Sequence, residues 1–462
     1  MQSRREFVQM AAAGSLVPPA IMADGIAYDP ETAQNGQAPD TKISANDRVR
    51  VALIGAGGQG SGDINSVLRT PGVEMVAVAD IYDGRRDRAQ EVWGSDTHKL
   101  FSTRDYRELL ARPDIDAVIV GTPDHWHATV SIDAMNAGKD VYCEKPMVQQ
   151  VDEGLKVAEA ARKTGRIFQV GSQRVSSIVY AKARDLVAAG AIGEVNMVEA
   201  FWDRNSAIGA WQYSLPPDAS PQTIDWDRFL GRAPKRPFEP IRLFRWRNYR
   251  DYGTGVPGDL FVHLFSGVHF VLGSHGPTRV MATGGLRFWH DGRDVPDVMM
   301  GLYDYPKTAT CPAFNLALKV NFADGAGESS NFRFVGSEGS LIIDGNRVIV
   351  AKRAKDREPG YTIGTFTKAT QAEFLKEYHA KYPERDPEMN ASHEDTHAAP
   401  GNYNDSQHHL RNFIACVRTR KQPVEDATFG FRAAGPALLT NMSYFDNKAI
   451  QWDPEAMQIV KG

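Results

Sequence analysis

A glycine-rich run early in the chain has the spacing needed to hold a phosphate group. It follows an apolar stretch, 49–54, and reads Gly55, Ala56, Gly57, Gly58, Gln59 and Gly60. In this G-x-G-x-x-G spacing the first glycine permits a tight turn, the second lets the backbone approach a pyrophosphate, and the third lets a helix pack closely on a strand. The start of the following helix would meet the phosphate charge. The run therefore predicts a dinucleotide-binding turn, with Gly58 and Gln59 in the phosphate cradle.

An acidic residue follows this run at the distance typical of a ribose contact. Asp80 ends the next apolar stretch, twenty residues after Gly60. Its carboxylate can accept hydrogen bonds from both ribose hydroxyls and would repel a 2′-phosphate. We therefore expect NAD rather than NADP, although Arg85 and Arg86 could reduce that repulsion.

Two more polar groups follow later apolar stretches, where a parallel sheet would bring them to the same crevice. The first is the segment 121–127, in which the expected cofactor-binding residues are Thr122, Pro123, Trp126 and His127. The second is Glu144-Lys145-Pro146, of which Glu144 and Lys145 are expected at the cofactor. A lysine beside a hydroxyl under oxidation can donate a hydrogen bond to its oxygen and stabilise developing alkoxide character.

Strand and helix patterns alternate through the residues that carry these groups. Apolar strand patterns lie at 49–54, 73–79, 116–121, 141–143 and 167–171, with helical patterns between them. Such alternation predicts a doubly wound parallel sheet with right-handed crossovers. We expect a Rossmann domain over residues 46–172 and an α/β fold class.

The pattern changes after residue 172. Stretches that alternate apolar and polar residues predict antiparallel strands with one covered face at 195–202, 279–284, 298–303, 317–322, 331–336 and 340–344. A helix is expected at 404–420, and the charged segment 352–395 is expected to be a surface excursion that could reach a neighbouring subunit's site. Residues 173–462 are therefore interpreted as a C-terminal α+β domain for substrate binding and oligomerisation, with a large, mostly antiparallel sheet.

The ordered set of motifs resembles the glucose–fructose oxidoreductase/inositol dehydrogenase (Gfo/Idh/MocA) family. The glycine run, the Thr-Pro-x-x-x-His stretch and Glu-Lys-Pro carry the resemblance, and Gly258 to His263 is similar to the family's Asp-x-x-x-His segment. It covers roughly residues 48–445. The segment 225–231, with Trp246-Arg247 and 252–255, looks like an exported bacterial branch of that family.

The resemblance implies a catalytic constellation. Lys145 would be the catalytic lysine and His263 the general acid/base, with Asp259 beside it. Asp259 and His263 are four residues apart and share a face of either a helix or a strand, which suits a carboxylate that orients an imidazole. The family often has an Asp three residues after this histidine, where this chain has Ser266. That leaves the details of proton relay open. The resemblance also implies a homo-oligomer, a dimer or tetramer formed through the open face of the C-terminal sheet.

Aromatic and cationic side chains suited to sugar rings occur in the second half of the chain. The candidate substrate contacts are Arg174, Trp202, Arg204, Trp211, Arg245 and Arg247. The histidines after residue 263 have no convincing metal-ligand spacing, so no metal site is expected.

Three functions fit these residues. The favoured one is an NAD-binding oxidoreductase that acts on a hydroxyl or keto group of a sugar or glycoside. The alternative is a glycoside hydrolase or lyase that uses bound NAD transiently: ring oxidation, elimination of the glycosidic bond, then reduction. NAD-using glycosidases related to this family often lack the Glu-Lys-Pro lysine, so Lys145 favours the dehydrogenase. A non-catalytic NAD-binding sensor would leave the coincidence of Lys145, Asp259 and His263 unexplained.

Composition excludes several classes of partner. The chain has 53 Lys and Arg against 57 Asp and Glu, a net charge of −4, and no basic run, which argues against nucleic acid or an anionic membrane. No apolar stretch is long enough to anchor the chain in a membrane. Cys143, Cys311 and Cys416 are too few and too scattered for a disulfide framework.

The first 45 residues resemble a twin-arginine export signal followed by a linker. Arg4-Arg5 precede a modestly apolar run, 9–23, that contains Pro18-Pro19, and a polar stretch follows to residue 43. We expect the twin-arginine translocase as a transient partner and a periplasmic or otherwise exported location. Because that route carries folded proteins, the NAD would be loaded before export, stay tightly bound and be recycled in place.

Overall fold

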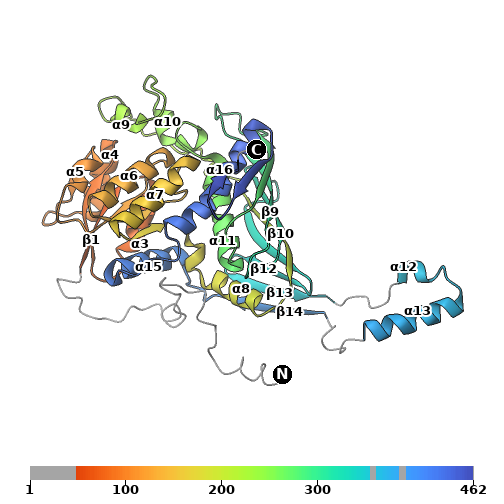
Figure 1. Ribbon diagram of the computed structural model, residues 1–462. Helices are drawn as coiled ribbons and strands as arrows, with labels where there is room; N and C mark the ends of the chain where they lie inside the picture. The colour runs from red at the N-terminus through yellow and green to blue at the C-terminus, as the bar shows by residue number, and fades with distance from the viewer. Residues whose placement is uncertain (1–47, 354–359, 384–391, 461–462) are drawn as a thin grey trace.

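A computed structural model describes residues 48–353, 360–383 and 392–460. The expected export signal and linker, 1–45, lie outside the described residues. Figure 1 shows the Rossmann half at the left, a large curved sheet at the right, and the pair α12 (Gly360–Ile363) and α13 (Lys368–Lys381) projecting away from the body. The projecting pair confirms that part of the segment 352–395 is a surface excursion.

Within the described residues, six strands form a parallel sheet in the order β3-β2-β1-β4-β5-β6. The strands are β1 (Val49–Ile54), β2 (Val73–Ala79), β3 (Phe101–Thr103), β4 (Ala117–Val120), β5 (Asp140–Cys143) and β6 (Phe168–Val170). The helices between them are α3 (Gly58–Val67), α4 (Asp83–Trp93), α5 (Tyr106–Leu110), α6 (Asp124–Asn136) and α7 (Val151–Thr164). This is the doubly wound Rossmann arrangement that the sequence predicts. The strand order reverses between β1 and β4, which are parallel, so their carboxyl ends form the ligand crevice.

A second sheet in the described part of the chain has ten strands in the order β14-β13-β12-β11-β7-β10-β9-β8-β15-β16. Its members are β7 (Val195–Asp203), β8 (Arg279–Gly285), β9 (Val298–Tyr305), β10 (Phe314–Asn321), β11 (Ser329–Gly336), β12 (Ser340–Asp344), β13 (Arg347–Lys352), β14 (His393–Ala398), β15 (Ile450–Asp453) and β16 (Gln458–Ile459). Neighbours are antiparallel except β7 and β10, which run parallel. The predicted mostly antiparallel sheet is confirmed. β14 was not expected, because its residues His393–Ala398 are all exposed and lack an apolar alternation.

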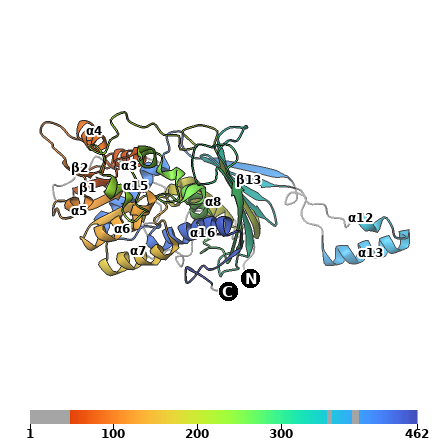
Figure 2. The same ribbon diagram turned by 90° about the horizontal axis from the view of Figure 1, so that it is seen from above.

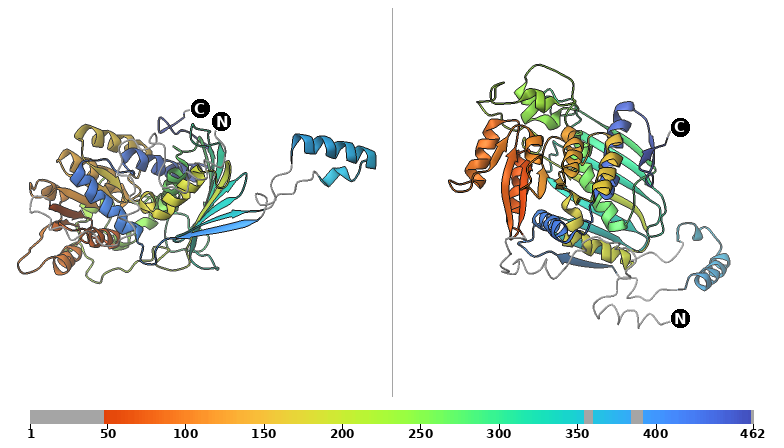
Figure 3. Two further views of the ribbon diagram at one scale, coloured as in Figure 1. Left: turned by 90° about the horizontal axis from the view of Figure 1, so that it is seen from below. Right: turned by 60° about the vertical axis from the view of Figure 1, so that its left-hand side comes forward.

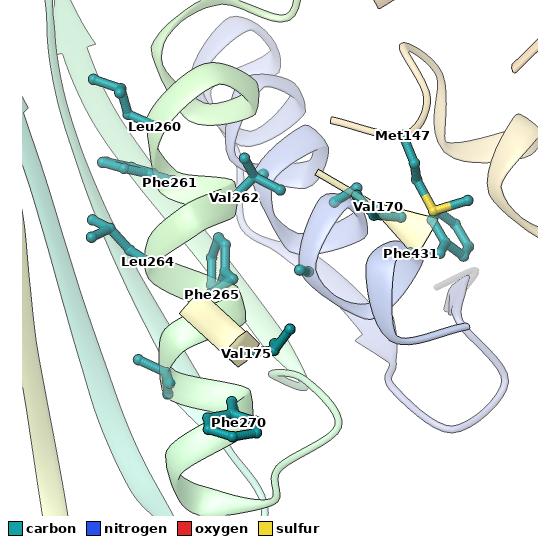
Figure 4. Close-up of a cluster of buried hydrophobic side chains, with 14 of the residues drawn as sticks. Met147, Val170, Val175, Leu260, Phe261, Val262, Leu264, Phe265, Phe270 and Phe431 are labelled. Atoms are coloured by element: carbon teal, nitrogen blue, oxygen red, sulfur yellow. The ribbon is translucent and has the colours of Figure 1, made fainter. Parts of the chain in front are cut away.

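Helices of the second half fill the space between the two sheets. Figures 2 and 3 show α8 (Ile178–Ala188) and α16 (Ala427–Asp446) on the side of the ten-stranded sheet that faces the Rossmann half. Every residue of α11 (Val262–Leu272) is buried there. In Figure 4, Phe431 of α16 lies beside Met147 and Val170 of the Rossmann half. The two halves therefore share one continuous hydrophobic core.

The helix predicted at 404–420 packs back on the first sheet. It is α15 (Asp405–Thr419), and its Leu410 and Phe413 are buried with Val51 and Leu53 of β1. Alternate β1 residues, Ala52 and Ile54, face the shared core on the other side. Residues after 173 thus complete the core of the Rossmann half.

The segment 204–256, here called the cap, connects β7 to the turn before α11. It contains α9 (Trp226–Leu230) and α10 (Pro240–Phe244), which lie above the α4 and α6 end of the Rossmann half in Figure 1. A separate hydrophobic cluster joins it to Tyr82, which follows β2; the cap members are Ile224, Phe229, Leu230, Ala233, Leu243, Phe244, Tyr249 and Tyr252. The backbone adds two bonds, from Asp225 N–H to Ile81 O and from Asp83 N–H to Thr223 O, both 2.9 Å.

Candidate functional site

A cavity of about 500 Å³ lies at the carboxyl ends of β1, β2 and β4, with the cap as its outer wall. It is lined by most of the expected cofactor residues: Gly55, Gly57, Gly58, Gln59, Asp80, Thr122, Pro123, Trp126, His127, Glu144 and Lys145. The cap contributes Tyr213, Ser214, Arg228, Phe229, Leu243, Phe244, Trp246 and Arg247. The structure therefore gathers residues from both halves around one elongated space.

The glycine run forms the turn from β1 into α3. Gly55 has φ +92°, and a Cβ there would lie 2.7 Å from the Gly121 carbonyl carbon. Gly60 packs directly on this turn, since a Cβ on it would lie 2.3 Å from Gly55 O. A Cβ on Gly58 would have no neighbouring atom within 4 Å. The cap position of α3 is Gly57, so no side-chain hydrogen bond caps the N-terminus of that helix, and the Arg85 guanidinium carbon lies 3.6 Å from where a Gly57 Cβ would stand. This backbone cradle fits a pyrophosphate group.

Asp80 stands beside this turn. Its Oδ2 accepts a 2.8 Å hydrogen bond from Ala56 N–H, and its Oδ1 accepts one of 2.9 Å from Tyr82 N–H. Arg85 Nη1 lies 3.7 Å from Oδ2, and the Arg85 guanidinium stacks 5.3 Å from the ring of Phe244 in the cap. The carboxylate is thus fixed by the backbone at the expected ribose position.

His127 links the two loops that end β4 and β5. Its ring nitrogens lie 2.7 Å from Pro146 O and 2.8 Å from Thr122 O. Burial lowers the pKa of His127 to about 4, so the ring is neutral at neutral pH. Trp126 also lines the cavity and donates from Nε1 to Phe229 O at 3.0 Å, which anchors the cap.

A second cavity of about 240 Å³ opens beside the first. The two share Gln59, Glu144, Lys145, Tyr213 and Arg247. The smaller one is further lined by Asp63, Tyr142, Gly171, Gln173, Trp202, Arg204, Asp259, Leu260, His263 and Ser406. All three expected catalytic residues therefore border it, and Lys145 stands at the junction.

Lys145 is held by Asp259. Its Nζ donates to Asp259 Oδ1 at 2.9 Å and to the Asp259 backbone carbonyl at 2.8 Å. Arg247 Nε reaches the same Oδ1 at 3.1 Å. Burial alone would raise the pKa of Asp259, but Lys145, Arg247 and Arg204 hold it below its ordinary value. The carboxylate is therefore ionised, and it fixes the lysine amine in place.

His263 has a different neighbourhood from the one its spacing implied. Asp259 lies in a π-helical turn, η4 (Pro257–Phe261), and gives its carboxylate to Lys145 rather than to the imidazole. Among the described residues, His263 Nδ1 has no hydrogen-bond partner. The ring packs 5.4 Å from the ring of Trp202. Burial and the nearby Lys145 lower the pKa of His263 well below its ordinary value, so the imidazole is neutral.

A carboxyl does lie beside Ser266, but it comes from a distant part of the chain. Ser266 Oγ is 3.2 Å from Glu425 Oε1 and 2.8 Å from Ser172 Oγ. Glu425 is fully buried, and burial raises its pKa well above its ordinary value. The Glu425 backbone carbonyl also accepts from Val170 N–H at 3.0 Å. This network ties α11 to the end of β6.

The expected substrate contacts divide into two groups. Trp202, Arg204 and Arg247 line the smaller cavity, and Arg174 stacks 5.3 Å from the ring of Trp202. The other two, Arg245 and Trp211, line neither cavity.

Their contacts explain why they do not. Arg245 Nε donates to Tyr213 O at 2.9 Å, so it supports the chain that carries Tyr213. Trp211 is fully buried against Phe322 and serves the core. Residue type alone could not separate these roles.

Several residues at the site had no signal in the sequence. Tyr213 borders both cavities, and Asp63, Gln173 and Ser406 border the smaller one. Tyr213 sits in an irregular stretch of the cap, so no periodicity marks it. Among the described residues, no cluster of His, Cys, Asp and Glu could hold a metal ion. In the same ranges, none of the helices has the length and apolar character needed to cross a membrane.

Comparison with known proteins agrees with this architecture. Residues 49–172 match the model of an oxidoreductase family with an NAD-binding Rossmann fold. Residues 184–434 match the model of that oxidoreductase family's C-terminal alpha/beta domain.

Curated relatives match part of the chain. An inositol 2-dehydrogenase of Gluconacetobacter diazotrophicus is 36% identical over 161 residues, 34% of this chain and 47% of that protein. A glycosyl hydrolase family 109 protein of Shewanella baltica is 32% identical over 214 residues, 43% of this chain and 45% of that protein. The chain thus spans just under half the length of these relatives.

Solved structures share the fold over most of the chain. A levoglucosan dehydrogenase in complex with NADH gives a TM-score of 0.62 at 16% identity and covers 87% of this chain and 99% of that one. An aldose-aldose oxidoreductase from Caulobacter crescentus gives 0.61 at 17% identity, over 87% of this chain and 99% of that one. Both halves match in order, and the chain belongs to the Gfo/Idh/MocA family of NAD-binding oxidoreductases.

Proposed function

We propose that this protein is an NAD-dependent oxidoreductase that interconverts a hydroxyl and a keto group on a sugar or glycoside. One observation carries the proposal: the Lys145 amine, fixed by Asp259 at 2.9 Å, stands where the cofactor cavity meets the smaller cavity that His263 borders. Inositol 2-dehydrogenase, levoglucosan dehydrogenase and aldose-aldose oxidoreductase among the similar proteins support this substrate class.

The residues of the larger cavity fit a dinucleotide. Gly57 and Gly58 carry no side chains at the N-terminus of α3, where the phosphate would bind, and Asp80 lies beside this turn, where the ribose would bind. Thr122 Oγ1 is buried with no hydrogen-bond partner in the described part of the chain, although it borders the cavity. Bound NAD would supply the hydride acceptor in the oxidation.

The proton chemistry falls to two side chains. As the hydroxyl carbon loses a hydride, the hydroxyl oxygen must lose a proton, and the neutral imidazole of His263 accepts it. Lys145 donates a hydrogen bond to the same oxygen and stabilises its negative charge. In the reverse direction the imidazolium returns the proton to the reduced carbonyl oxygen. Asp259 holds the Lys145 amine in position throughout.

We propose NAD rather than NADP as the cofactor. Asp80 would repel a 2′-phosphate, and the arginines nearby already have acidic partners. Arg85 faces Asp80, and both Arg86 and Arg104 pair with Asp83. Mass spectrometry of the nucleotide released from purified protein is expected to find NAD. A predominance of NADP would contradict this assignment.

We further propose that the protein is an exported member of its family, acts as a homo-oligomer and retains its cofactor. The cap supports retention, because it forms the outer wall of the cavity and packs against Tyr82. Retention outside the cytoplasm needs a dissociation constant well below micromolar, roughly 11 kcal/mol or more of binding free energy. A second sugar or carbonyl compound would then regenerate the cofactor in place.

The test is to purify the protein without added NAD, dialyse it extensively and assay it with pairs of sugars. We expect one sugar to be oxidised while the other is reduced, with no soluble NAD. Activity that vanishes on dialysis and returns only with stoichiometric NAD would overturn retention. A protein that forms no keto-sugar from any of the sugars or glycosides would overturn the oxidoreductase assignment.

One observation keeps a glycosidase as the second candidate. The match to the family 109 glycosyl hydrolase covers more of this chain than the match to inositol 2-dehydrogenase. In that reaction oxidation, elimination and reduction would follow one another on a single glycoside. Product analysis separates the two functions. Free aglycone with no net redox change supports the glycosidase, and a keto-sugar supports the dehydrogenase.

A further inference from the structure

Two guanidinium groups flank one indole beside the reacting groups. Trp202 lies near the end of β7 with its ring 5.4 Å from the ring of His263. The guanidinium carbon of Arg174 is 5.3 Å from that indole, and the guanidinium carbon of Arg204 is 5.8 Å from it. Arg174 comes from the short helix η2 (Gln173–Ser176), so the arrangement joins two separate segments. Of the three side chains, Trp202 and Arg204 line the smaller cavity.

Each of these two arginines has N–H groups that donate to none of the described residues. Arg204 Nη1 donates to Gly209 O at 2.8 Å, and none of the described carboxylates lies within ion-pair distance of Arg204. Arg174 lies 3.6 Å from Asp405 on one side. Its Nε is buried and has no hydrogen-bond partner among the described residues. A guanidinium has five N–H donors, so Arg204, which lines the smaller cavity, can receive an anion there, with the positive charge of Arg174 nearby.

Three cations, Lys145, Arg204 and Arg247, and three carboxyls, Asp63, Glu144 and Asp259, line the smaller cavity, but none of these carboxyls forms an ion pair with Arg204. The Asp259 carboxylate pairs with Lys145 at 2.9 Å and with Arg247 at 3.1 Å. Asp63 and Glu144 instead accept hydrogen bonds from Gln59 Nε2, at 2.9 and 3.4 Å.

Those two carboxyls do not supply two full negative charges. Burial raises the pKa of Glu144 to about 7 and that of Asp63 well above its ordinary value. Asp203, next to Arg204 in sequence, is engaged by Lys319 at 2.8 Å. Arg174 therefore has Asp405 as its partner, whereas Arg204 has no matching anion among the described residues.

We propose that the substrate is an acidic sugar, one that carries a carboxylate, and that Arg204 binds this carboxylate with support from Arg174. Arginine suits the task because its planar N–H pairs match the two oxygens of a carboxylate. Trp202 offers a face for the sugar ring between the carboxylate and the reacting hydroxyl at Lys145 and His263. The inference rests on the proposed oxidoreductase function and names its substrate class.

The test compares acidic and neutral sugars of the same configuration. Glucuronate and glucose form one pair, galacturonate and galactose another, and glucose 6-phosphate probes a different anion. The readout is single-turnover reduction of the bound cofactor, followed by fluorescence. We expect kcat/KM to favour each uronate over its neutral partner by about tenfold or more, the range for one hydrogen bond to a charged group.

Variants at Arg204 then locate the effect. Arg204→Gln keeps a donor for Gly209 O but removes the charge, and should lower kcat/KM for the uronates about 10- to 100-fold, a larger factor than for the neutral sugars. Arg204→Lys should restore part of the loss. Arg333→Gln, on β11 and paired with Glu199, is the matched control and should change nothing. Thermal midpoint and bound NAD content report whether each variant is folded.

The outcomes separate the two proposals. If neutral sugars react as well as uronates, or Arg204→Gln weakens both equally, the acidic-sugar inference is wrong while the oxidoreductase function stands. A preference for glucose 6-phosphate over glucuronate contradicts the carboxylate. If no sugar in the panel reduces the bound cofactor, both proposals fall.

Discussion

The two ends of the elongated site are built in different ways. At the cofactor end, the phosphate cradle and Asp80 come from one β-α-β unit, residues 49–80, and neighbouring strands supply the rest. At the substrate end, the cavity wall combines Lys145 after β5, Trp202 from β7, Tyr213 from the cap and His263 from α11. The first end is local in sequence and depends on backbone shape. The second is assembled over long range and depends on charge.

This difference predicts how each end should fail. A cradle made of backbone is sensitive to a single added methyl group, because no side chain there can move aside. A cavity made of charged side chains tolerates changes in volume but loses function when one charge is removed. Variants that impair the cofactor end and not the substrate end, or the reverse, would support this distinction. Variants that impair both ends equally would contradict it.

Lys145→Met should give the largest effect. It removes the amine at the junction, so turnover should fall about 100-fold or more while bound NAD content stays unchanged. Lys156→Met, on the exposed face of α7, is the matched control and should leave turnover intact. Single-turnover rates and nucleotide content measure the two quantities. Near-normal turnover would remove Lys145 from the proposed mechanism.

Gly60→Ala should damage the cofactor end. The added methyl would lie 2.3 Å from Gly55 O, so the turn must shift, at an expected cost of roughly 1–3 kcal/mol. We expect a lower thermal midpoint and less bound NAD. Gly62→Ala, in the same helix, meets nothing within 4 Å and should retain NAD, with stability unchanged or raised by up to about 1 kcal/mol. Equal NAD content in the two variants would show that the cradle is not a tight fit.

Phe244→Ala tests the cap. Phe244 packs edge-on against Tyr82 at 5.4 Å and under the guanidinium of Arg85. Its loss should loosen the outer wall and speed NAD dissociation about tenfold, equivalent to ~1.4 kcal/mol. Dilution into buffer with a nucleotide scavenger measures the rate. Phe374→Ala, on the projecting α13, is the control. An unchanged dissociation rate would argue against the cap as the retaining element.

The smallest expected effect is a shift in the pH profile of sugar oxidation. Burial lowers the pKa of His263 below its ordinary 6.5, and the neutral form accepts the proton. The rate should therefore fall only below pH 6.5, as His263 becomes protonated. Asp259→Asn removes a charge that raises this pKa, so the acidic limb should move to still lower pH, by about one unit or less.

Glu144 provides the control for that profile, because its own pKa is about 7. Glu144→Gln should remove any inflection near pH 7 and leave the lower limb. An acidic limb at or above pH 6.5 in both backgrounds would contradict His263 as the proton acceptor.

The parts of the molecule that sequence could predict are those fixed by consecutive residues. β1, the glycine turn and Asp80 follow from short-range rules, and the fold class follows from alternation. β3 was not predicted because Phe101 is the only apolar residue of its three, whereas the equally short β6 is mostly apolar. β14 escaped because its exposed residues are held only by pairing with β13.

The substrate end was harder to predict for a physical reason. The spacing of Asp259 and His263 predicted that the two side chains share one face of their element. The partner of Asp259 is instead Lys145, 114 residues away. Arg245 and Arg247 are both arginines of one segment, yet only Arg247 turns to the cavity. Which way such a side chain points depends on packing that no local pattern records.

The position of α15 has a consequence for how the chain is synthesised. The β1 face that contains Val51 and Leu53 leaves the ribosome early, whereas α15, which packs on it, ends at Thr419. Helix α3 covers part of that face early through Ile64 and Val67, but some 350 residues must be added before α15 covers the rest. Part of an apolar sheet surface therefore stays available to chaperones during most of translation. Completion of the Rossmann core waits for a helix that is made near the end of the chain.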